Sequence, residues 1–399
     1  MDNTYINPNH FSGNDSEKIN QAVQVAAACG KIVRVPAREP DAAEERTYWL
    51  LDSAILLPAN TTLLLENCKL KLSNQCRDNF IRSANAGYGI SDIRELENIH
   101  VKGIGTVLLE GADDPRSTGD RSKVLGERAY GTDAGKSGEL QHGDWRNVGV
   151  LFASVKNFSI SGLTIKDSHC WGISMEYCSD GVIRDIVFDS KGVMNINGTE
   201  EQTPNQDGLD IRRGCRNLLV ENISGKTGDD LVAVTAILSH REMTKTFEAT
   251  EISQIPDDPR ENDVCNIIIR NVRGYSAGNH QIVRLLNASG VRLRNILIDG
   301  VVDCSPVDGL KNIATIRIGD NVAAWGGIAP AGDAAHIQIC NVFSRSKRSI
   351  LIAGSIADSI ISNVINANSE TPTVQCDSGW EYVLNLHLSN LMPDTTNRR

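Results

Sequence analysis

The segment NQDGLDIRRGCRNLLVENISGKTGDDLVAV, from Asn205 to Val234, contains two acidic clusters, each followed by a short apolar run. The first cluster is at Asp207, and the second, at Asp229 and Asp230, begins 22 residues later. The apolar runs have the length and composition of strands. The segment therefore predicts two successive turns of a repeating structure that carry acids at the same point of each turn.

A nine-residue pattern recurs along the rest of the chain. A polar or turn-forming residue is followed by alternating apolar positions and often by a second Asn or Gly. Several intervals between the copies are close to 23 residues or to twice that number. The copies start at Asn98, Asn157, Asp180, Asn217, Asn266, Gly290, His336, Asp358 and Asn385.

Short period-2 runs at this interval, without helical patterns between them, predict an all-β fold, a single-stranded right-handed parallel β-helix. Each turn of such a coil stacks on the previous one at about 4.8 Å. Asn, Gly and Asp suit the turns because they tolerate left-handed backbone. A β-sandwich with coincidental spacing is the alternative. We expect one domain over residues 1–399.

The N-terminal region, residues 1–46, is expected to cap the open end of the coil with a helix. Asn14 and Glu17 have the spacing of a capping box, and Gly30 is placed to end the helix. Two polar segments, 111–145 and 239–263, interrupt the repeat, and we expect them to flank a cleft as long loops. The apolar stripe expected on the helix consists of Ile19, Ala22, Val23, Ala26 and Ala27.

Composition narrows the functional classes. The 399 residues carry a formal net charge of −10, so no basic surface indicates nucleic-acid binding. No run of eighteen apolar residues indicates a membrane span, and MDNTYINPNHF has no charged leader or apolar core of a signal peptide. We expect a cytoplasmic protein, or a secreted one if a leader has been removed. The ten cysteines show no CxxC spacing, so we expect no metal site and no cofactor.

Stacking would bring Asp207, Asp229 and Asp230 within several ångströms of each other. Mutual repulsion would then raise at least one pKa, as a general acid near neutral pH requires. Carboxyls about 6.5–9.5 Å apart favour inversion at a glycosidic carbon, and those about 5–5.5 Å apart favour retention. Each acid alone is also compatible with a plain turn residue, because Asp bonds its own backbone.

These motifs resemble those of the polygalacturonases, glycoside hydrolase family 28, in the pectin-lyase-like superfamily. NQDG and GDD are followed by SAGNHQIV, from Ser276 to Val283, and TIRIGD, from Thr315 to Asp320. The family shows Asn-Thr-Asp, Gly/Gln-Asp-Asp, Gly-His-Gly and Arg-Ile-Lys in this order. The resemblance extends from Asn147 to Asp320 by motif.

The resemblance implies that Asp229 is the acid that protonates the leaving oxygen and that Asp207 and Asp230 activate water. His280 would tune the acid through a hydrogen bond, and Arg317 would contact the sugar. The anomeric centre would be inverted without a metal.

The chain departs from the family pattern at several positions. Gly319 stands where the family has the lysine that helps to hold a uronate carboxylate. Gln206 replaces Thr, and Asn279 and Gln281 flank His280 where Gly is usual. Galacturonate is therefore not implied as firmly as hydrolysis.

Further candidates for substrate binding lie near these motifs. Asn205 and Asp210 flank Asp207, and the guanidinium groups of Arg212 and Arg284 can grip a hydroxyl-rich or anionic ligand. Ion pairs with Asp210 or Glu221 are the structural alternative for these arginines. Trp145 and Trp325 occur in polar or Gly-rich segments and are candidate platforms for sugar rings, whereas Trp171 is expected in the core.

The sequence thus predicts a glycoside hydrolase, with a carbohydrate as its partner. A lyase or a fructosyl transferase on the same fold and a non-catalytic carbohydrate-binding solenoid are the alternatives. A calcium-dependent lyase would lose activity with a chelator. The oligomeric state is left open, and a homo-oligomer is compatible with the sequence.

Overall fold

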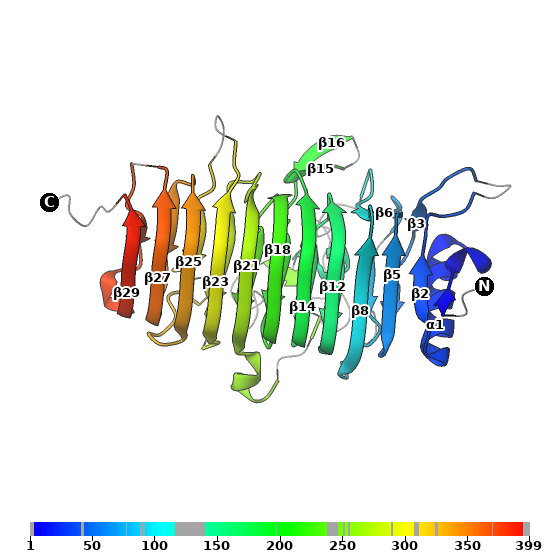
Figure 1. The fold of residues 1–399 in the computed structure, drawn as a ribbon, viewed down its shortest axis with the longest axis horizontal. Helices are drawn as coiled ribbons and strands as arrows, with labels where there is room; N and C mark the ends of the chain where they lie inside the picture. The colour runs from blue at the N-terminus through cyan, green and yellow to red at the C-terminus, as the bar shows by residue number, and fades with distance from the viewer. Residues whose placement is uncertain are drawn as a thin grey trace.

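The chain forms a right-handed parallel β-helix, as predicted, with its two ends at opposite ends of a long coil (Figure 1). The structure is a computed structural model. It describes residues 4–40, 44–76, 78–87, 90, 92–115, 140–196, 198–237, 246–249, 252–253, 256–288, 290–306, 311–323, 326–368 and 370–393.

The larger of two parallel sheets has 15 strands and forms the face seen in Figure 1. Its long strands pair in sequence order, each with the next turn of the coil. The strands are β1 (Tyr5–Ile6), β2 (Ile32–Val35), β3 (Trp49–Leu51), β5 (Thr61–Glu66), β6 (Lys69–Leu72), β8 (Leu96–Ile104), β9 (Leu108–Glu110), β12 (Val155–Lys166), β14 (Ser179–Asp189), β18 (Arg216–Thr227), β21 (Val264–Ser276), β23 (Leu293–Asp303), β25 (Ala334–Ser344), β27 (Ile356–Asn366) and β29 (Val383–Met392).

The second parallel sheet, here called the site sheet, has ten shorter strands. In sequence order they are β4 (Ile55–Leu57), β7 (Ile81–Ser83), β11 (Val150–Ala153), β13 (Ile173–Glu176), β17 (Leu209–Arg212), β19 (Val232–Ala236), β22 (Gln281–Asn287), β24 (Ala314–Ile318), β26 (Arg348–Ile352) and β28 (Val374–Cys376). Every residue of β11, β13, β17 and β19 is buried, so both faces of the site sheet are covered there.

Shorter elements surround the coil. β10 (Leu140–Asp144) pairs in parallel with β20 (Thr246–Ala249), and β15 (Val193–Ile196) pairs with β16 (Thr199–Gln202) as an antiparallel hairpin. The 3-10 helices are η1 (Pro8–His10), η3 (Trp145–Asn147), η4 (Pro259–Asn262) and η6 (Trp380–Tyr382).

Asparagine ladders set the corners of the coil. In one row, Asn217 has a φ of 56°, donates to Asp180 at 2.9 Å and accepts from Asn266 at 2.9 Å. Asn and Asp tolerate this left-handed backbone, and each side chain bonds the same position of a neighbouring coil. The row consists of Asn98, Asn157, Asp180, Asn217, Asn266, Asn295, His336, Asp358 and Asn385, all with positive φ.

This row contains every predicted repeat start except Gly290, where the prediction is wrong. Ile267 pairs with Ile296, so the residue in register with Asn266 is Asn295. The pattern at Gly290 begins five residues too early because a turn precedes this strand.

The capping helix α1 (Asp15–Cys29) is confirmed. Asn14 and Glu17 form both halves of the capping box, and Gly30 ends the helix with a φ of 65°. Four residues of the predicted stripe, Ile19, Ala22, Val23 and Ala26, are fully buried against the first coils. Ala27 is only half-buried.

Most of the predicted loop 111–145 lies outside the described residues, whereas of the predicted loop 239–263 the structure describes 246–249, 252–253 and 256–263. Their described ends include β10, β20, η3 and η4. That the loops flank a cleft stays a prediction. Among the described residues, no helix is long and apolar enough to span a membrane.

Two substitutions of Asn217 separate the contribution of its hydrogen bonds to stability from that of its left-handed backbone. Asn217→Ala should lower the free energy of unfolding by about 1–3 kcal/mol, because a Cβ without a bonding amide is strained at positive φ and two hydrogen bonds are lost. Asn217→Gly loses the same bonds without the strain and should lose less stability. Urea unfolding checks both variants, and equal losses would show that backbone strain is not a factor.

Candidate active site

The acids of the two predicted turns lie on successive coils. Leu209 pairs with Val232, and the peptide of Gly208 donates to the Asp230 carbonyl at 2.9 Å. Asp207 and Asp230 therefore occupy the same position of adjacent turns, just before β17 and β19. The Asp230 peptide N–H donates to Asp207 Oδ1 at 3.2 Å. The spacing of 23 residues between Asp207 and Asp230 is thus converted into direct contact.

Asp229 and His280 complete the cluster. Nδ1 of His280 lies 3.0 Å from Oδ1 of Asp229, which also accepts the Asp230 peptide N–H at 3.0 Å. His280 precedes β22, on the next coil, and its own peptide N–H donates to Ser276 Oγ at 3.0 Å. The peptide N–H of Gln281 donates to Asp230 Oδ1 at 2.8 Å. All four predicted catalytic residues therefore converge, and their catalytic roles remain a proposal.

Burial is the main cause of the raised pKa values in this cluster. It raises the pKa of Asp230 to about 7, with a further contribution from the charge of Asp229. Burial, followed by the charges of Asp229 and Asp230, also raises the pKa of Asp207 well above its usual range. Arg284 opposes both shifts. The cluster therefore keeps at least one proton at pH values where an exposed aspartate has lost it.

Two arginines face the acids from the neighbouring strands. Arg284 on β22 pairs directly with Arg317 on β24. Nη2 of each guanidinium lies 2.7 Å from Oδ2 of Asp320, and Nη1 of Arg284 is 3.6 Å from Oδ2 of Asp230. Asp320 was not predicted as a site residue, although it ends the quoted TIRIGD motif.

A cavity of about 350 Å³ opens beside this cluster. Besides the four predicted catalytic residues, its lining includes the candidates Asn205, Asp210, Arg284 and Arg317. The rest of the lining is mainly apolar. It consists of Trp171, Ala233, Thr235, Gln281, Leu286, Ile313 and Val322.

Two predicted substrate ligands are misplaced. Trp145 is only 1% exposed, because it packs in a cluster with Trp171 and Ile252 on the outer side of β11. Arg212 is fully buried, and its guanidinium lies 4.3 Å from the centre of the Trp171 ring. Neither lines the cavity, so the predictions of a sugar platform at Trp145 and a sugar ligand at Arg212 are wrong. Trp325 lies outside the described residues.

Gln206, a departure from the family pattern, is a brace beneath the acids. It is fully buried, its side chain accepts from the Gly192 peptide at 2.8 Å and donates to the Ser168 carbonyl at 2.6 Å. Its own carbonyl accepts the Asp229 peptide N–H at 3.0 Å. The longer side chain therefore ties three segments together at the point where the acids emerge.

The cluster also contains the atoms of a small metal site. One ligand atom each from Asp229, Asp230 and His280 lie within 4.8 Å of one another. Two carboxylates and an imidazole suit a divalent cation such as Zn²⁺ or Mn²⁺. The same three groups are equally able to exchange protons, because the imidazole already contacts one carboxylate.

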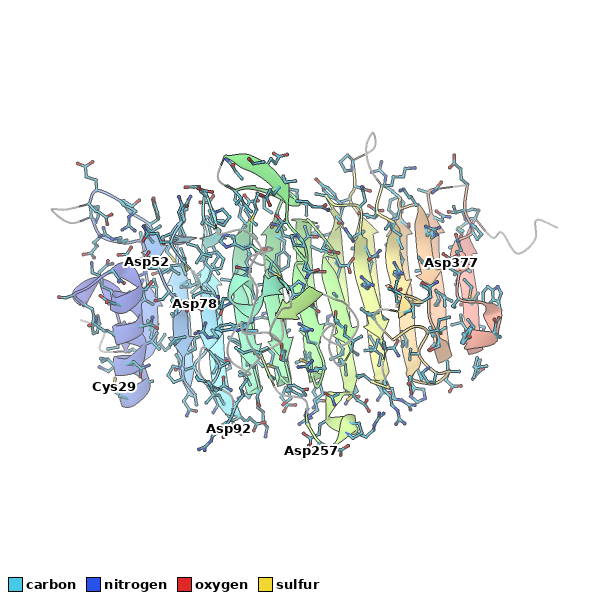
Figure 2. The ribbon with its side chains drawn as sticks, turned by 180° about the vertical axis from the view of Figure 1, so that it is seen from behind. Cys29, Asp52, Asp78, Asp92, Asp257 and Asp377 are labelled. Atoms are coloured by element: carbon cyan, nitrogen blue, oxygen red, sulfur yellow. The ribbon has the colours of Figure 1, made fainter. Side chains whose placement is uncertain are left out.

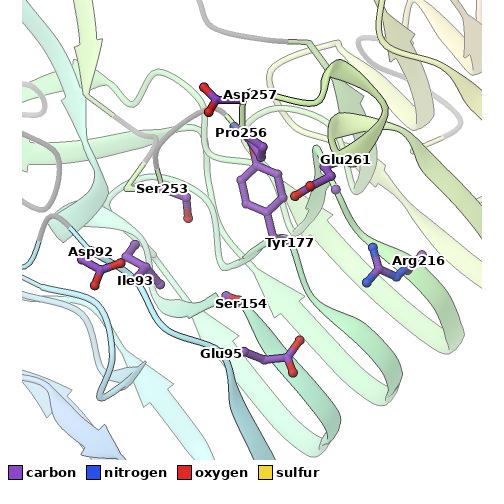
Figure 3. A pocket seen from close by; sticks show the side chains of 11 residues that line it. Asp92, Ile93, Glu95, Ser154, Tyr177, Arg216, Ser253, Pro256, Asp257 and Glu261 are labelled. Atoms are coloured by element: carbon purple, nitrogen blue, oxygen red, sulfur yellow. The ribbon is translucent and has the colours of Figure 1, made fainter.

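A second cavity, of about 400 Å³, lies just after the last residues of β11, β13 and β17, whereas the acids lie before β17 and β19 (Figure 3). Tyr177, Ser253 and Glu261 line it, together with Asp92 and Asp257, which lie along one edge of the coil in Figure 2. None of the clustered acids reaches it. It therefore lacks the shared proton that makes the first cavity chemically distinctive.

The raised pKa of Asp230 predicts a pH-dependent stability. Its folded-state pKa of about 7 lies above the unfolded value of about 3.9, so its stabilising proton is fully bound below about pH 4 and is lost as the pH rises through 7. Asp230→Asn should remove up to about 3 kcal/mol of this fall in unfolding free energy between pH 5 and pH 8. Urea unfolding at both pH values measures it.

The exposed Asp257 provides the control, because Asp257→Asn also replaces a carboxyl with an amide, but at a side chain that lies in solvent. It should retain the pH dependence of the wild type. A wild-type pH dependence in Asp230→Asn would contradict the assignment.

Comparison with known proteins relates the chain to a family of glycoside hydrolases. Residues 52–250, a range that includes the three acids, match the sequence model of glycosyl hydrolases family 28. The fold resembles the polygalacturonase from Erwinia carotovora ssp. carotovora, at a TM-score of 0.57 and 14% identity, over 96% of this chain and 93% of that one.

A tailspike protein double mutant of E. coli bacteriophage HK620, in complex with a pentasaccharide, has a similar fold. The TM-score is 0.54 at 14% identity, over 95% of this chain and 62% of that one. No match was found among curated proteins. With its parallel β-helix and the matched family model, the chain belongs to glycosyl hydrolases family 28 and is a polygalacturonase-like glycoside hydrolase.

Proposed function

We propose that the enzyme hydrolyses a glycosidic bond of a pectin-like or related oligo- or polysaccharide with inversion of the anomeric centre. Asp229 acts as the acid, and Asp207 and Asp230 activate the water. The observation that carries this proposal is the convergence of three carboxyls in one cavity, where burial raises the pKa of Asp207 and Asp230.

Exposure supports Asp229 as the acid. Its side chain is 19% exposed, whereas that of Asp230 is 2% exposed. A carboxyl that protonates a leaving oxygen must reach the substrate directly. The 3.0 Å contact between Asp229 and the His280 imidazole fixes the orientation of the carboxyl.

Position suits Asp207 and Asp230 to the base role. Both line the cavity, and the two are linked through the Asp230 peptide N–H, so a water held between them is bound on two sides. As Asp229 releases its proton to the leaving oxygen, the water gives a proton to this pair. The number of protons on the cluster is unchanged, and transfer among the three carboxyls restores the starting state.

Inversion rests on the family resemblance and not on spacing. The nearest oxygens of Asp229 and Asp230 are within 4.8 Å, below the range of about 6.5–9.5 Å typical of inverting enzymes. We expect proton NMR to detect the product first with the anomeric configuration opposite to that of the substrate bond. Initial formation of the retained anomer would instead assign one aspartate as a nucleophile.

Asp229→Asn tests the acid role. It keeps the shape of the side chain but cannot donate an acidic proton, so kcat should fall by about 10²–10⁴-fold. The screen uses neutral and uronic oligosaccharides, with reducing-sugar release as the readout. Substrate affinity should change far less than kcat. Full activity in the variant would overturn the assignment.

Two controls accompany this screen. Asp257→Asn, in the second cavity, should keep wild-type activity, because Asp257 is remote from the acids. A chelator should also leave the rate unchanged, since the proposed route uses no metal. Loss of activity with the chelator and recovery with a divalent cation would favour a metal at Asp229, Asp230 and His280.

A further inference from the structure

The charges that line the first cavity are predominantly negative. Among the described lining residues, Asp207, Asp210, Asp229 and Asp230 contribute four carboxylates, Arg284 and Arg317 contribute two cations, and none is a lysine. Four negative and two positive charges leave −2, or −1 when the acids share one proton and His280 is neutral. A substrate carboxylate in this cavity would face a net repulsive field.

The two cations are also already neutralised. Asp320 is 1% exposed, and its Oδ2 lies 2.7 Å from Nη2 of each guanidinium group. Its Oδ1 is held by the peptide N–H groups of Asn321 at 2.8 Å and Val322 at 3.0 Å, so the carboxylate cannot turn away. With Asp230 on the other side of Arg284, two carboxylates balance the two guanidinium groups.

The backbone excludes a further cation at the position where the resemblance places lysine. Gly319 has a φ of 70°, and a Cβ there would lie 2.5 Å from Cα of Gly354 on the next coil. Both the conformation and the close approach require glycine. No side chain at position 319 can therefore hold a uronate carboxylate in this fold.

The remaining wall favours an uncharged ring. Trp171, Leu286 and Ile313 present carbon atoms, which pack well against the C–H faces of a sugar. A carboxylate against this wall would lose its hydration without gaining a cation.

We propose that the subsite next to the acids takes an uncharged sugar and excludes a uronate, and that Asp320 sets this selectivity by engaging both arginines. This inference rests on the proposed hydrolysis at the same site. Asp320 is a positioning residue, because it acts through Arg284 and Arg317.

The test uses pairs of oligosaccharides that share linkage and ring configuration and differ only at C6, as hydroxymethyl or carboxylate. We expect the wild type to favour the neutral member by at least about 10-fold in kcat/KM. Faster cleavage of the uronide would overturn the inference and leave the proposed function standing. Cleavage of neither member, across a panel of linkages, would instead defeat the proposed function.

Asp320→Asn isolates the role of the shared carboxylate. The amide can keep the two bonds at Oδ1 but no longer neutralises the guanidinium groups, so the uronide-to-neutral ratio of kcat/KM should rise about 10-fold. An unchanged ratio in a folded variant would contradict the role of Asp320.

The matched control is Asp15→Asn. Asp15 is also buried and also bridges two arginines, Arg38 at 3.0 Å and Arg46 at 2.6 Å, but it lies in the N-terminal cap. Its substitution should leave the ratio unchanged. If Asp320→Asn does not fold, Thr235→Lys adds a cation to the cavity wall and should raise the ratio in the same direction. Failure to do so would overturn the inference.

Discussion

Parallel hydrogen bonding between successive coils is the constraint on which the site depends. Each turn must repeat the backbone of the previous one, so residues separated by one winding become direct neighbours. The carboxyls of Asp207 and Asp230 meet because the coils before β17 and β19 are in register, and His280 joins them from the coil before β22. The corner ladders have a matching role on the other sheet, because their side-chain amides keep the same register where the backbone turns. A site composed of separate short segments is held rigidly without a dedicated scaffold.

The buried carboxyls of the site lower the stability that the coil provides. Like charges brought together in a buried position raise each other's pKa, and the fold must hold them against that repulsion. Peptide N–H groups from Asp230 and Gln281, together with the guanidinium of Arg284, compensate part of this cost. Asp320 in turn fixes that guanidinium. The contacts therefore run from the acids to Arg284 and from Arg284 to Asp320. Each charged group that compensates another also restricts the charge of the ligands that the cavity can bind.

The sequence was sufficient for the coil, the capping helix and the convergence of the acids, because all three follow from periodicity and local backbone preference. Gly290 was assigned out of register because sequence does not reveal how long a turn is before pairing resumes. Trp145 and Arg212 were placed at the ligand for a related reason. Period-2 alternation indicates which side of a strand a residue faces, but not that the outer face of the site sheet is covered by η3 and residue Ile252. Asp320 was missed because its importance lies in two arginines on different strands.

The close approach of Gly319 and Gly354 shows how the fold limits its own chemistry. The sequence alone gives no reason against lysine at position 319. The backbone of the next coil excludes it, because a Cβ there would clash with Gly354. Compensation would require the neighbouring turn to move, and that turn is fixed by parallel bonding on both sides: Gly354 donates to the Ile318 carbonyl at 3.0 Å, and Gly319 donates to that of Leu285 at 2.6 Å. A change of substrate charge is therefore more accessible through Thr235, which lines the cavity, or through Asp320, which contacts the two lining arginines, than through the turn itself.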